Sequence, residues 1–184
     1  TAGVAAPAYG GIPVTHRDDA SAVAFVTGHE DPDKPRELSL DYAALASFPG
    51  TLVFYMGVRR LPKIAAGLID SGRAADEPAA VIERGTFSDQ RTVTGSLSSL
   101  PELAKSEGVR APAVIVVGPV VAQRESLRWF ENRPLYGKSV VVTRARAQAS
   151  GLAAALSALG ASVVELPTIR IVQRIDDAEV RAAV

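Results

Sequence analysis

Cysteine is absent from this 184-residue sequence, and histidine occurs only twice. Without cysteine, the chain has no disulfide bonds, thiolate nucleophiles or cysteine metal ligands. The two histidines, His16 and His29, stand too far apart in the chain to indicate a metal site by themselves. No metal-dependent chemistry is therefore expected.

The sequence also lacks an excess of charge and a long apolar run. Its 20 basic and 20 acidic residues cancel, so composition gives no reason to expect nucleic acid or an anionic membrane as a partner. Crossing a bilayer takes about 20 consecutive apolar residues, and neither such a run nor a signal peptide is visible. With 47% hydrophobic residues, the chain is expected to bury a real core and to be a soluble, cytoplasmic protein.

What the sequence does contain is an alternation of strand and helix patterns, organised around residues 51–72, TLVFYMGVRRLPKIAAGLIDSG. The apolar, β-branched run Thr51–Tyr55 is typical of a strand covered on both faces. From Leu61 onward, apolar residues recur at the spacing of one helical stripe. Pro62 suits a first helical turn, and Gly72 suits the left-handed position just past the last one. The segment predicts a strand, a turn and an amphipathic helix.

Similar patterns on either side of this segment indicate an α/β fold class with a largely parallel or mixed sheet. Helices are predicted at three places: at 40–48 with Ser39 as its cap, from Ser99, where Ser-Leu-Pro-Glu fits a capping box, and from Pro119 through Trp129 and Phe130. Further strands are predicted at 20–27, 78–83, 90–97 and 113–117.

The character of the chain changes after residue 131. Residues 132–138 have the composition of a linker, and a strand at 139–143, a helix ending before Gly160 and a strand at 162–166 follow. A further strand is predicted at 169–172 and a further helix at 176–184. One strand–helix–strand unit is too small to be stable by itself, so we expect an incomplete second domain.

Few residues stand out as candidates for chemistry from the residue pattern alone. Met56 follows the central strand, at the sheet edge where open α/β sheets bind ligands, although a lone methionine is more often a core residue. Gly85 is typical of a tight turn, and Arg17, Arg59 and Arg60 are typical of a solvated surface. Neither the GxGxxG nor the GxxxxGK[ST] nucleotide-binding loop is present.

Several segments in a fixed order identify a resemblance: GIPVTHRD, VTGHE, TLVFYMGV followed by RRLPKIAAGLIDSGR, PAAVIERGTFSDQRTVTGSL, and PAVIVVGPVVAQRESLRWF. In this order they resemble the carboxyl-terminal half of the uroporphyrinogen-III C-methyltransferases, of the tetrapyrrole methylase superfamily, over residues 1–130. The tail GKSVVVTRARAQASGLAAALSALGASVVELPTIRI is similar to the start of uroporphyrinogen-III synthase. The sequence is therefore interpreted as half of a methylase fused to the beginning of a synthase.

The resemblance implies an organisation and an activity. Residues 1–17 correspond to the end of the first methylase domain and a connector, 18–131 to the second methylase domain, 132–138 to a linker and 139–184 to the synthase portion. Such methylases bind S-adenosylmethionine between two α/β domains and release S-adenosylhomocysteine. They methylate two ring carbons of uroporphyrinogen III, giving precorrin-2 for sirohaem and cobalamin-type cofactors, and they are commonly homodimers.

The resemblance also implies roles for individual residues. Thr1, Ala2, Met56 and Gly85 match positions that contact the cofactor, and Gly85 is the small residue that lets the backbone approach the adenosine part. Arg17 and Met56 match positions near the substrate. A guanidinium at Arg17 suits a tetrapyrrole rich in carboxylates.

The catalytic residues and the family's glycine-rich loop are expected in the first domain, and neither is in this sequence. We therefore expect the chain to be inactive alone. Pro112 is placed near the cofactor by the same resemblance.

Three alternatives remain open from the sequence. The first is a non-catalytic binding or dimerisation module that kept a methylase fold. The second is a generic nucleotide-binding domain, and the third is part of a methylase that acts on a later cobalamin precursor. The missing GxGxxG fingerprint counts against the second alternative.

Overall fold

The computed structural model describes residues 2–28 and 40–170, apart from the side chains of 146–148. The chain divides into two compact units, Thr1–Arg133 and Pro134–Val184. Within the described ranges, no helix is both long and apolar enough to cross a membrane.

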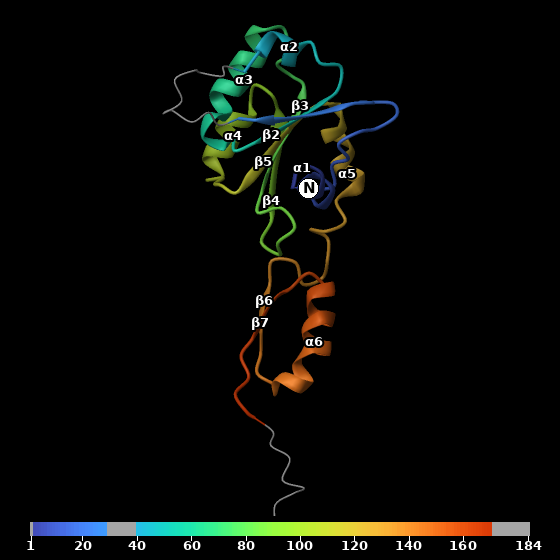
Figure 1. The fold of residues 1–184 in the computed structure, drawn as a ribbon, viewed down its shortest axis with the longest axis vertical. Coiled ribbons are helices and arrows are strands. Elements are labelled where there is room, and N and C mark those ends of the chain that lie inside the picture. The colour runs from blue at the N-terminus through green and yellow to red at the C-terminus, as the bar shows by residue number, and fades with distance from the viewer. Residues whose placement is uncertain (1, 29–39, 171–184) are drawn as a thin grey trace, which may run out of the picture. The chain divides into compact units, whose positions relative to one another are not determined.

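The first unit (Figure 1) is built on a mixed five-stranded sheet in the order β1-β2-β5-β3-β4. β1 runs parallel to β2, while β5 runs antiparallel to both β2 and β3, and β4 runs antiparallel to β3. β1, β2 and β3 therefore all end at the same edge of the sheet, where β5 begins. The mixed α/β fold predicted from the sequence is confirmed. The strand bounds are β1 Val23–Thr27, β2 Thr51–Tyr55, β3 Pro78–Glu83, β4 Arg91–Ser96 and β5 Ala113–Val117.

The sheet separates two apolar clusters because successive side chains of a strand point to opposite faces. On one face, Leu52, Phe54 and Ile115 pack with apolar residues of α3 and α4. On the other face, Val53 and Val116 pack with Ala6 of α1 and with residues of η2. β2 and β5 lie in the middle of the sheet and are buried on both faces, as predicted.

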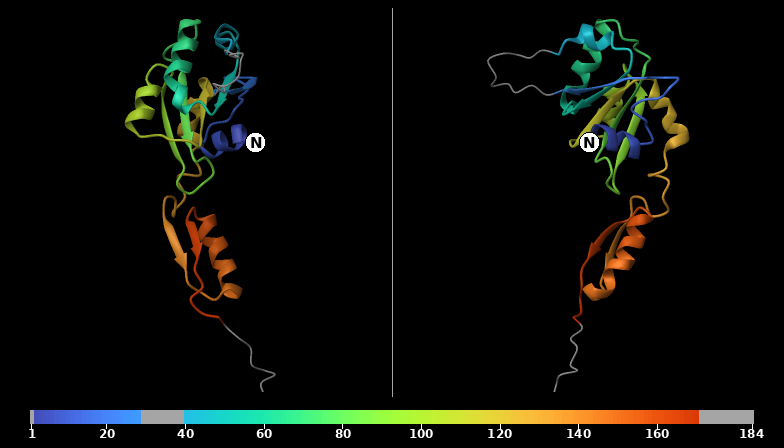
Figure 2. Two further views of the ribbon diagram at one scale, coloured as in Figure 1. Left: turned by 60° about the vertical axis from the view of Figure 1, so that its left-hand side comes forward. Right: turned by 45° about the vertical axis from the view of Figure 1, so that its right-hand side comes forward.

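The helices accordingly form two layers (Figure 2). α2, η1, α3 and α4 follow β1, β2 and β4 on the first face, and α1, η2 and α5 belong to the second. Their bounds are α1 Ala2–Tyr9, α2 Tyr42–Ala46, η1 Val58–Arg60, α3 Leu61–Asp70, α4 Leu100–Ser106, η2 Pro119–Gln123 and α5 Arg124–Leu127.

The helix termini test the sequence signals individually. α3 has Pro62 in its first turn and Gly72 with a φ of 102° after its end, as predicted. α2 is capped by Asp41, whose carboxylate accepts a hydrogen bond from the Ala44 amide at 2.9 Å, and the expected cap Ser39 lies outside the described residues. The capping box at α4 is wrong, because Ser99 makes no side-chain cap bond and its hydroxyl accepts instead from the amide of the preceding strand's last residue.

The helix predicted from Pro119 through Phe130 is confirmed only in part, over residues 119–127. The chain forms the short 3₁₀ segment η2 and a single α-turn, α5, and leaves the helix before Trp129. Trp129 and Phe130 pack instead against the ring of Tyr9 in α1, at centroid distances of 5.2 and 4.7 Å. This long-range aromatic contact overrides the local tendency to continue the helix.

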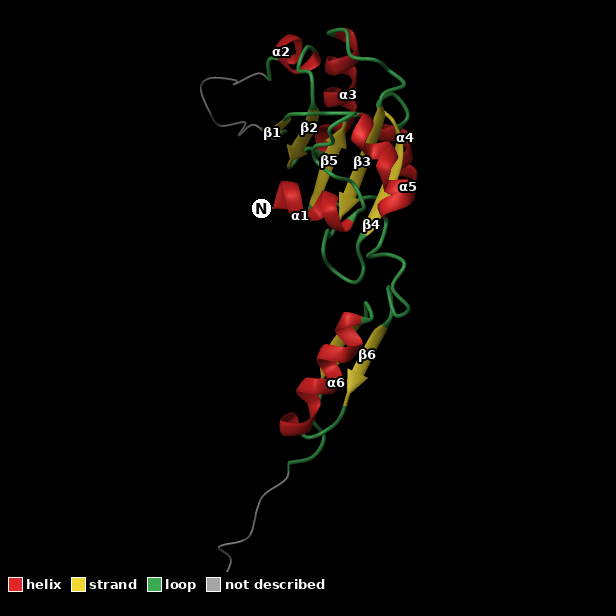
Figure 3. Cartoon of the chain, turned by 90° about the vertical axis from the view of Figure 1, so that its right-hand side faces the viewer, coloured by secondary structure: helices red, strands yellow, loops and turns green. Residues whose placement is uncertain are grey.

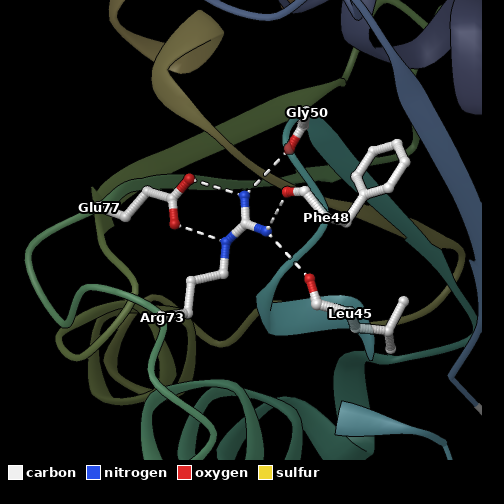
Figure 4. Close-up of polar contacts among 5 residues, drawn as sticks. All are labelled: Leu45, Phe48, Gly50, Arg73 and Glu77. Carbon is white, nitrogen blue, oxygen red and sulfur yellow. Dashed lines mark hydrogen bonds and ion pairs between the residues drawn. The ribbon is translucent and has the colours of Figure 1, made fainter. Parts of the chain in front are cut away.

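A buried arginine fixes α2, the end of α3 and the start of β2 to one another (Figure 4). The Arg73 guanidinium forms a bidentate ion pair with Glu77 and donates to the backbone carbonyls of Leu45, Phe48 and Gly50. A buried charge is stable only when it is paired and hydrogen-bonded, and the planar fork of arginine meets several acceptors at once. This cluster lies where β2 begins, at the sheet edge opposite to the ends of β1, β2 and β3.

The second unit contains β6 (Ser139–Val142), α6 (Arg146–Ala158) and β7 (Ser162–Glu165). β6 and β7 pair in parallel, and Gly160 takes a φ of 101° between α6 and β7, so the predicted strand–helix–strand unit is confirmed. Residues 169 and 170, predicted as strand, are irregular. Residues 171–172 and the predicted helix at 176–184 lie outside the described residues.

Candidate functional site

The ends of β1, β2 and β3 lie at one edge of the sheet, together with the segment that leads into β5. The Gly28 amide donates to the Tyr55 carbonyl at 2.7 Å, and the Arg84 amide donates to the Pro112 carbonyl at 2.9 Å. We call this surface the carboxyl edge and define it by Gly28, residues 55–57, residues 84–86 and Pro112. Open α/β sheets bind ligands at such an edge.

The backbone is strained at the carboxyl edge. Among residues 2–28 and 40–170, the non-glycine residues with positive φ are Met56 at 54°, Arg84 at 50° and Thr86 at 78°. All three lie on this edge. Each left-handed residue costs about 1–2 kcal/mol, and such residues persist where the surrounding structure imposes them, which is commonly at functional sites. The strain marks this edge as the leading candidate for a ligand site.

Met56 presents its side chain to solvent at the carboxyl edge. It is 61% exposed, so the interpretation of Met56 as a core residue is wrong. Gly57 follows it, and a Cβ on Gly28 would lie 2.9 Å from the Gly57 Cα. The ends of β1 and β2 therefore approach as closely as only glycine permits, and Met56 projects from a tight turn.

The amino end of α1 lies against the same edge (Figure 3). The Gly3 amide donates to the Tyr55 hydroxyl at 3.0 Å, and a Cβ on Gly3 would lie only 2.2 Å from that oxygen. Ala2 begins the helix and is exposed. The structure thus brings Ala2 close to the strand end that carries Met56, whereas Thr1 lies outside the described residues.

Gly85 contacts the middle of α1. A Cβ on Gly85 would lie 2.4 Å from the Ala6 Cβ and 3.0 Å from the Ala6 Cα. Among the described residues, the absence of a side chain at Gly85 therefore lets α1 pack closely against this turn. Its predicted role beside the adenosine part of a cofactor stays a prediction.

A polar network that the sequence did not reveal joins the strained turn to the carboxyl end of α1. Buried Gln90 accepts a hydrogen bond from the Thr86 amide at 2.8 Å, and its side-chain amide donates to the Tyr9 carbonyl and to the Glu131 carboxylate. Glu131 also pairs with Arg124. These residues are far apart in the chain, and no local pattern marks them.

Arg17 is not part of the carboxyl edge. It is exposed, in a turn closed by paired hydrogen bonds between His16 and Ala20. Two residues later, Asp19 accepts a hydrogen bond at 2.7 Å from Gln123, which follows the end of β5. Since β5 ends at the opposite edge of the sheet, the structure separates Arg17 from the other candidate residues.

The carboxyl edge is an open, partly apolar surface. Next to this edge, α1 exposes Val4 and β1 exposes Phe25, whose side chains are 50% and 46% exposed. Two hollows of about 480 and 410 Å³ lie instead near the starts of β3 and β2. In the ranges 2–28 and 40–170, no group of three acidic, histidine or cysteine side chains is placed to hold a metal.

These features fit one side of an S-adenosylmethionine site. Exposed apolar side chains such as Met56 suit the adenine ring and the methylene groups of such a ligand. Gly85 does not fit this interpretation, because the space beside it is filled by Ala6 of α1 and not free for a ligand.

Comparison with known proteins gives consistent matches. The family described as Tetrapyrrole (Corrin/Porphyrin) Methylases matches residues 1–101. The S-adenosyl-L-methionine-dependent uroporphyrinogen III methyltransferase of Methanosarcina barkeri is 53% identical over 121 residues, which cover 66% of this chain and 47% of that protein. The uroporphyrinogen-III C-methyltransferase of Bacillus subtilis is 40% identical over 170 residues, which cover 92% of this chain and 35% of that protein.

A solved structure matches as well. The uroporphyrin-III C-methyltransferase of Thermus thermophilus, complexed with S-adenosylhomocysteine, is 34% identical, with a TM-score of 0.52 over 64% of this chain and 50% of that one. The chain therefore spans half or less of the length of these relatives. The family match covers more than half of the chain, from α1 to the start of α4. This chain belongs to the tetrapyrrole (corrin/porphyrin) methylase family.

Proposed function

We propose that this chain supplies one side of the S-adenosylmethionine cleft of a uroporphyrinogen-III C-methyltransferase. The observation that carries the proposal is the carboxyl edge, where the strained residues, the exposed Met56 side chain and the amino end of α1 coincide. The relatives described as S-adenosylmethionine-dependent or as complexed with S-adenosylhomocysteine support the choice of cofactor. The product would be precorrin-2, for sirohaem or cobalamin-type cofactors.

When bound, S-adenosylmethionine would supply an electrophilic methyl group for transfer to a nucleophilic carbon of the substrate, and S-adenosylhomocysteine would be left. The residues of this chain contribute binding and orientation. Met56 and Ala2 would contact the cofactor, and the apolar side chains of Val4 and Phe25 would help to keep water from the reacting atoms once the other side of the cleft covers them. Holding two reactants in line and desolvating them accounts for much of such a rate enhancement.

Arg17 is proposed as a contact for a substrate carboxylate. Because its turn lies away from the carboxyl edge, it would hold a peripheral part of the tetrapyrrole and leave the methylated carbon near Met56. An arginine binds a carboxylate in a planar, bidentate manner, which suits this role.

Since the chain spans half or less of its relatives, we propose that a first methylase domain supplies the other side of the cleft and the catalytic residues. Within the chain, 1–17 would end that domain and form the connector, 18–131 would be the second methylase domain, and 132–138 a linker. The segment 139–184 would begin a uroporphyrinogen-III synthase portion. The enzyme would be a cytoplasmic homodimer, and this chain would be inactive alone.

Calorimetric titration of S-adenosylhomocysteine into the full-length protein tests the proposal. We expect binding by the parent protein and clearly weaker binding by Met56→Ala. Leu103→Ala serves as the matched control, because Leu103 is an exposed apolar residue of α4 on the other face of the sheet. No binding by the parent, or equal binding of a nicotinamide dinucleotide, would refute the proposed site. Methyl transfer by the 184 residues alone would refute the proposed division of the cleft.

A further inference from the structure

We infer that Tyr55 is a positioning residue of this site: its hydroxyl fixes the amino end of α1 relative to Met56. The inference rests on the proposed function, and it adds a residue that neither the sequence pattern nor the family resemblance indicated.

The contact itself is a hydrogen bond between a strand and a helix. The Gly3 amide donates to the Tyr55 Oη at 3.0 Å, across 52 residues of sequence. The bond joins the backbone of α1 to the last residue of β2, so it holds the helix against the end of that strand.

The position of the Tyr55 hydroxyl is set by the sheet. Its carbonyl accepts from the Gly28 amide at 2.7 Å, and its ring stacks on that of Phe25 from β1, with a centroid distance of 6.1 Å and an interplanar angle of 22°. Two neighbouring strands therefore hold the ring, and the helix is located from a rigid element.

The amino end of α1 packs closely on the Tyr55 and Phe25 side chains. A Cβ on Gly3 would lie 2.2 Å from the Tyr55 Oη and 2.6 Å from Phe25 Cε1, so only glycine allows α1 to come this close. Met56 follows Tyr55 directly, and Ala2 precedes Gly3. The hydrogen bond thus connects the immediate neighbours of two proposed cofactor contacts.

The test compares Tyr55→Phe with Tyr9→Phe in the full-length protein. Both variants remove one hydroxyl from a ring that packs at an end of α1, and Tyr9 lies at the far end against Trp129 and Phe130. We expect Tyr55→Phe to raise the Kd for S-adenosylhomocysteine about five-fold, the effect of losing one hydrogen bond. In Tyr55→Phe, exchange of the Gly3 amide hydrogen is expected to accelerate, while the melting temperature stays close to the parent value. Tyr9→Phe is expected to keep both the melting temperature and the affinity of the parent protein.

A purely structural role would instead lower the melting temperature of Tyr55→Phe without changing the Kd. An unchanged Kd for Tyr55→Phe, or an equal rise for Tyr9→Phe, would overturn the inference while leaving the proposed function intact. Absence of binding by the parent protein would overturn the proposed function, and the inference with it.

Discussion

The packing of α1 on the carboxyl edge predicts a large effect for Gly85→Ala. The added Cβ would lie 2.4 Å from the Ala6 Cβ and 3.0 Å from the Ala6 Cα. Unstrained carbon contacts lie at about 3.5–4.0 Å, so α1 has to move by about 1 Å to accept the methyl group. Ala6 is 5% exposed and part of the second apolar cluster, which means that the movement disturbs the core.

The expected cost follows from this contact alone. Gly85 does not have a positive φ, so alanine adds no backbone strain, and overpacking a core by such a group typically costs about 1–3 kcal/mol. We expect the free energy of unfolding to fall by about 2 kcal/mol. Affinity for S-adenosylhomocysteine should fall too, because α1 carries Ala2.

Urea unfolding followed by tryptophan fluorescence measures this effect selectively. Trp129 is the only tryptophan of the chain, and it packs against Tyr9 of α1, so its emission reports on the first unit. Ala6→Gly removes the colliding methyl group at a cost of about 1 kcal/mol for glycine in a helix. The double variant Ala6→Gly/Gly85→Ala should therefore be less destabilised than the sum of the single variants. A neutral Gly85→Ala, or additive effects, would refute the packing argument.

Three further substitutions separate stability from binding. Met56→Gly relieves a left-handed residue but raises the conformational entropy of the unfolded chain, so the free energy of unfolding should stay within about 1 kcal/mol of the parent value. Calorimetry should show weaker binding of S-adenosylhomocysteine, because the Met56 side chain is lost, and unchanged affinity would contradict this. Arg73→Met leaves the partly buried Glu77 carboxylate and three backbone carbonyls without the guanidinium, which should lower the unfolding free energy by about 3–5 kcal/mol and leave the affinity of the folded protein unchanged. Thr51→Val removes a buried hydroxyl that has no hydrogen-bond partner in the part of the chain that the structure describes. Thermal unfolding should therefore show an unchanged stability or a gain of up to about 1 kcal/mol. A clear loss of stability would show that the hydroxyl has a partner after all.

The elements that the sequence predicted well are those with a strong local pattern. β2, β3 and β5 have the predicted bounds, and α3 begins and ends beside Pro62 and Gly72. Burial on both faces requires a continuous apolar run, and a helix on a sheet requires one apolar stripe. The order of the strands could not be predicted in this way, because β5 lies between β2 and β3 and no local pattern encodes that insertion.

α1 shows why part of the candidate site escaped prediction. It contains small residues and Pro7, which give little helical signal. Long-range hydrogen bonds hold this helix in place. They join Gly3 to Tyr55 across 52 residues of sequence, Tyr9 to Gln90 across 81 and Ala8 to Trp129 across 121. Helical stability in proteins comes mostly from such tertiary packing.

Met56 was located correctly at the end of a strand, but its exposure was not predicted from the pattern alone. A methionine has no particular preference for a left-handed turn, so nothing in the local sequence distinguishes it from a core residue. The family resemblance supplied the functional interpretation. The structure supplied the turn that exposes the side chain.

A crystal structure of the full-length protein with S-adenosylhomocysteine tests the central claim most directly. We predict that the ligand lies on the carboxyl edge, with atoms within about 4.0–4.5 Å of the Met56 side chain and of the amino end of α1. A ligand bound beside Arg73, or one that leaves Met56 as exposed as it is now, would contradict the assignment of this edge as the cofactor site.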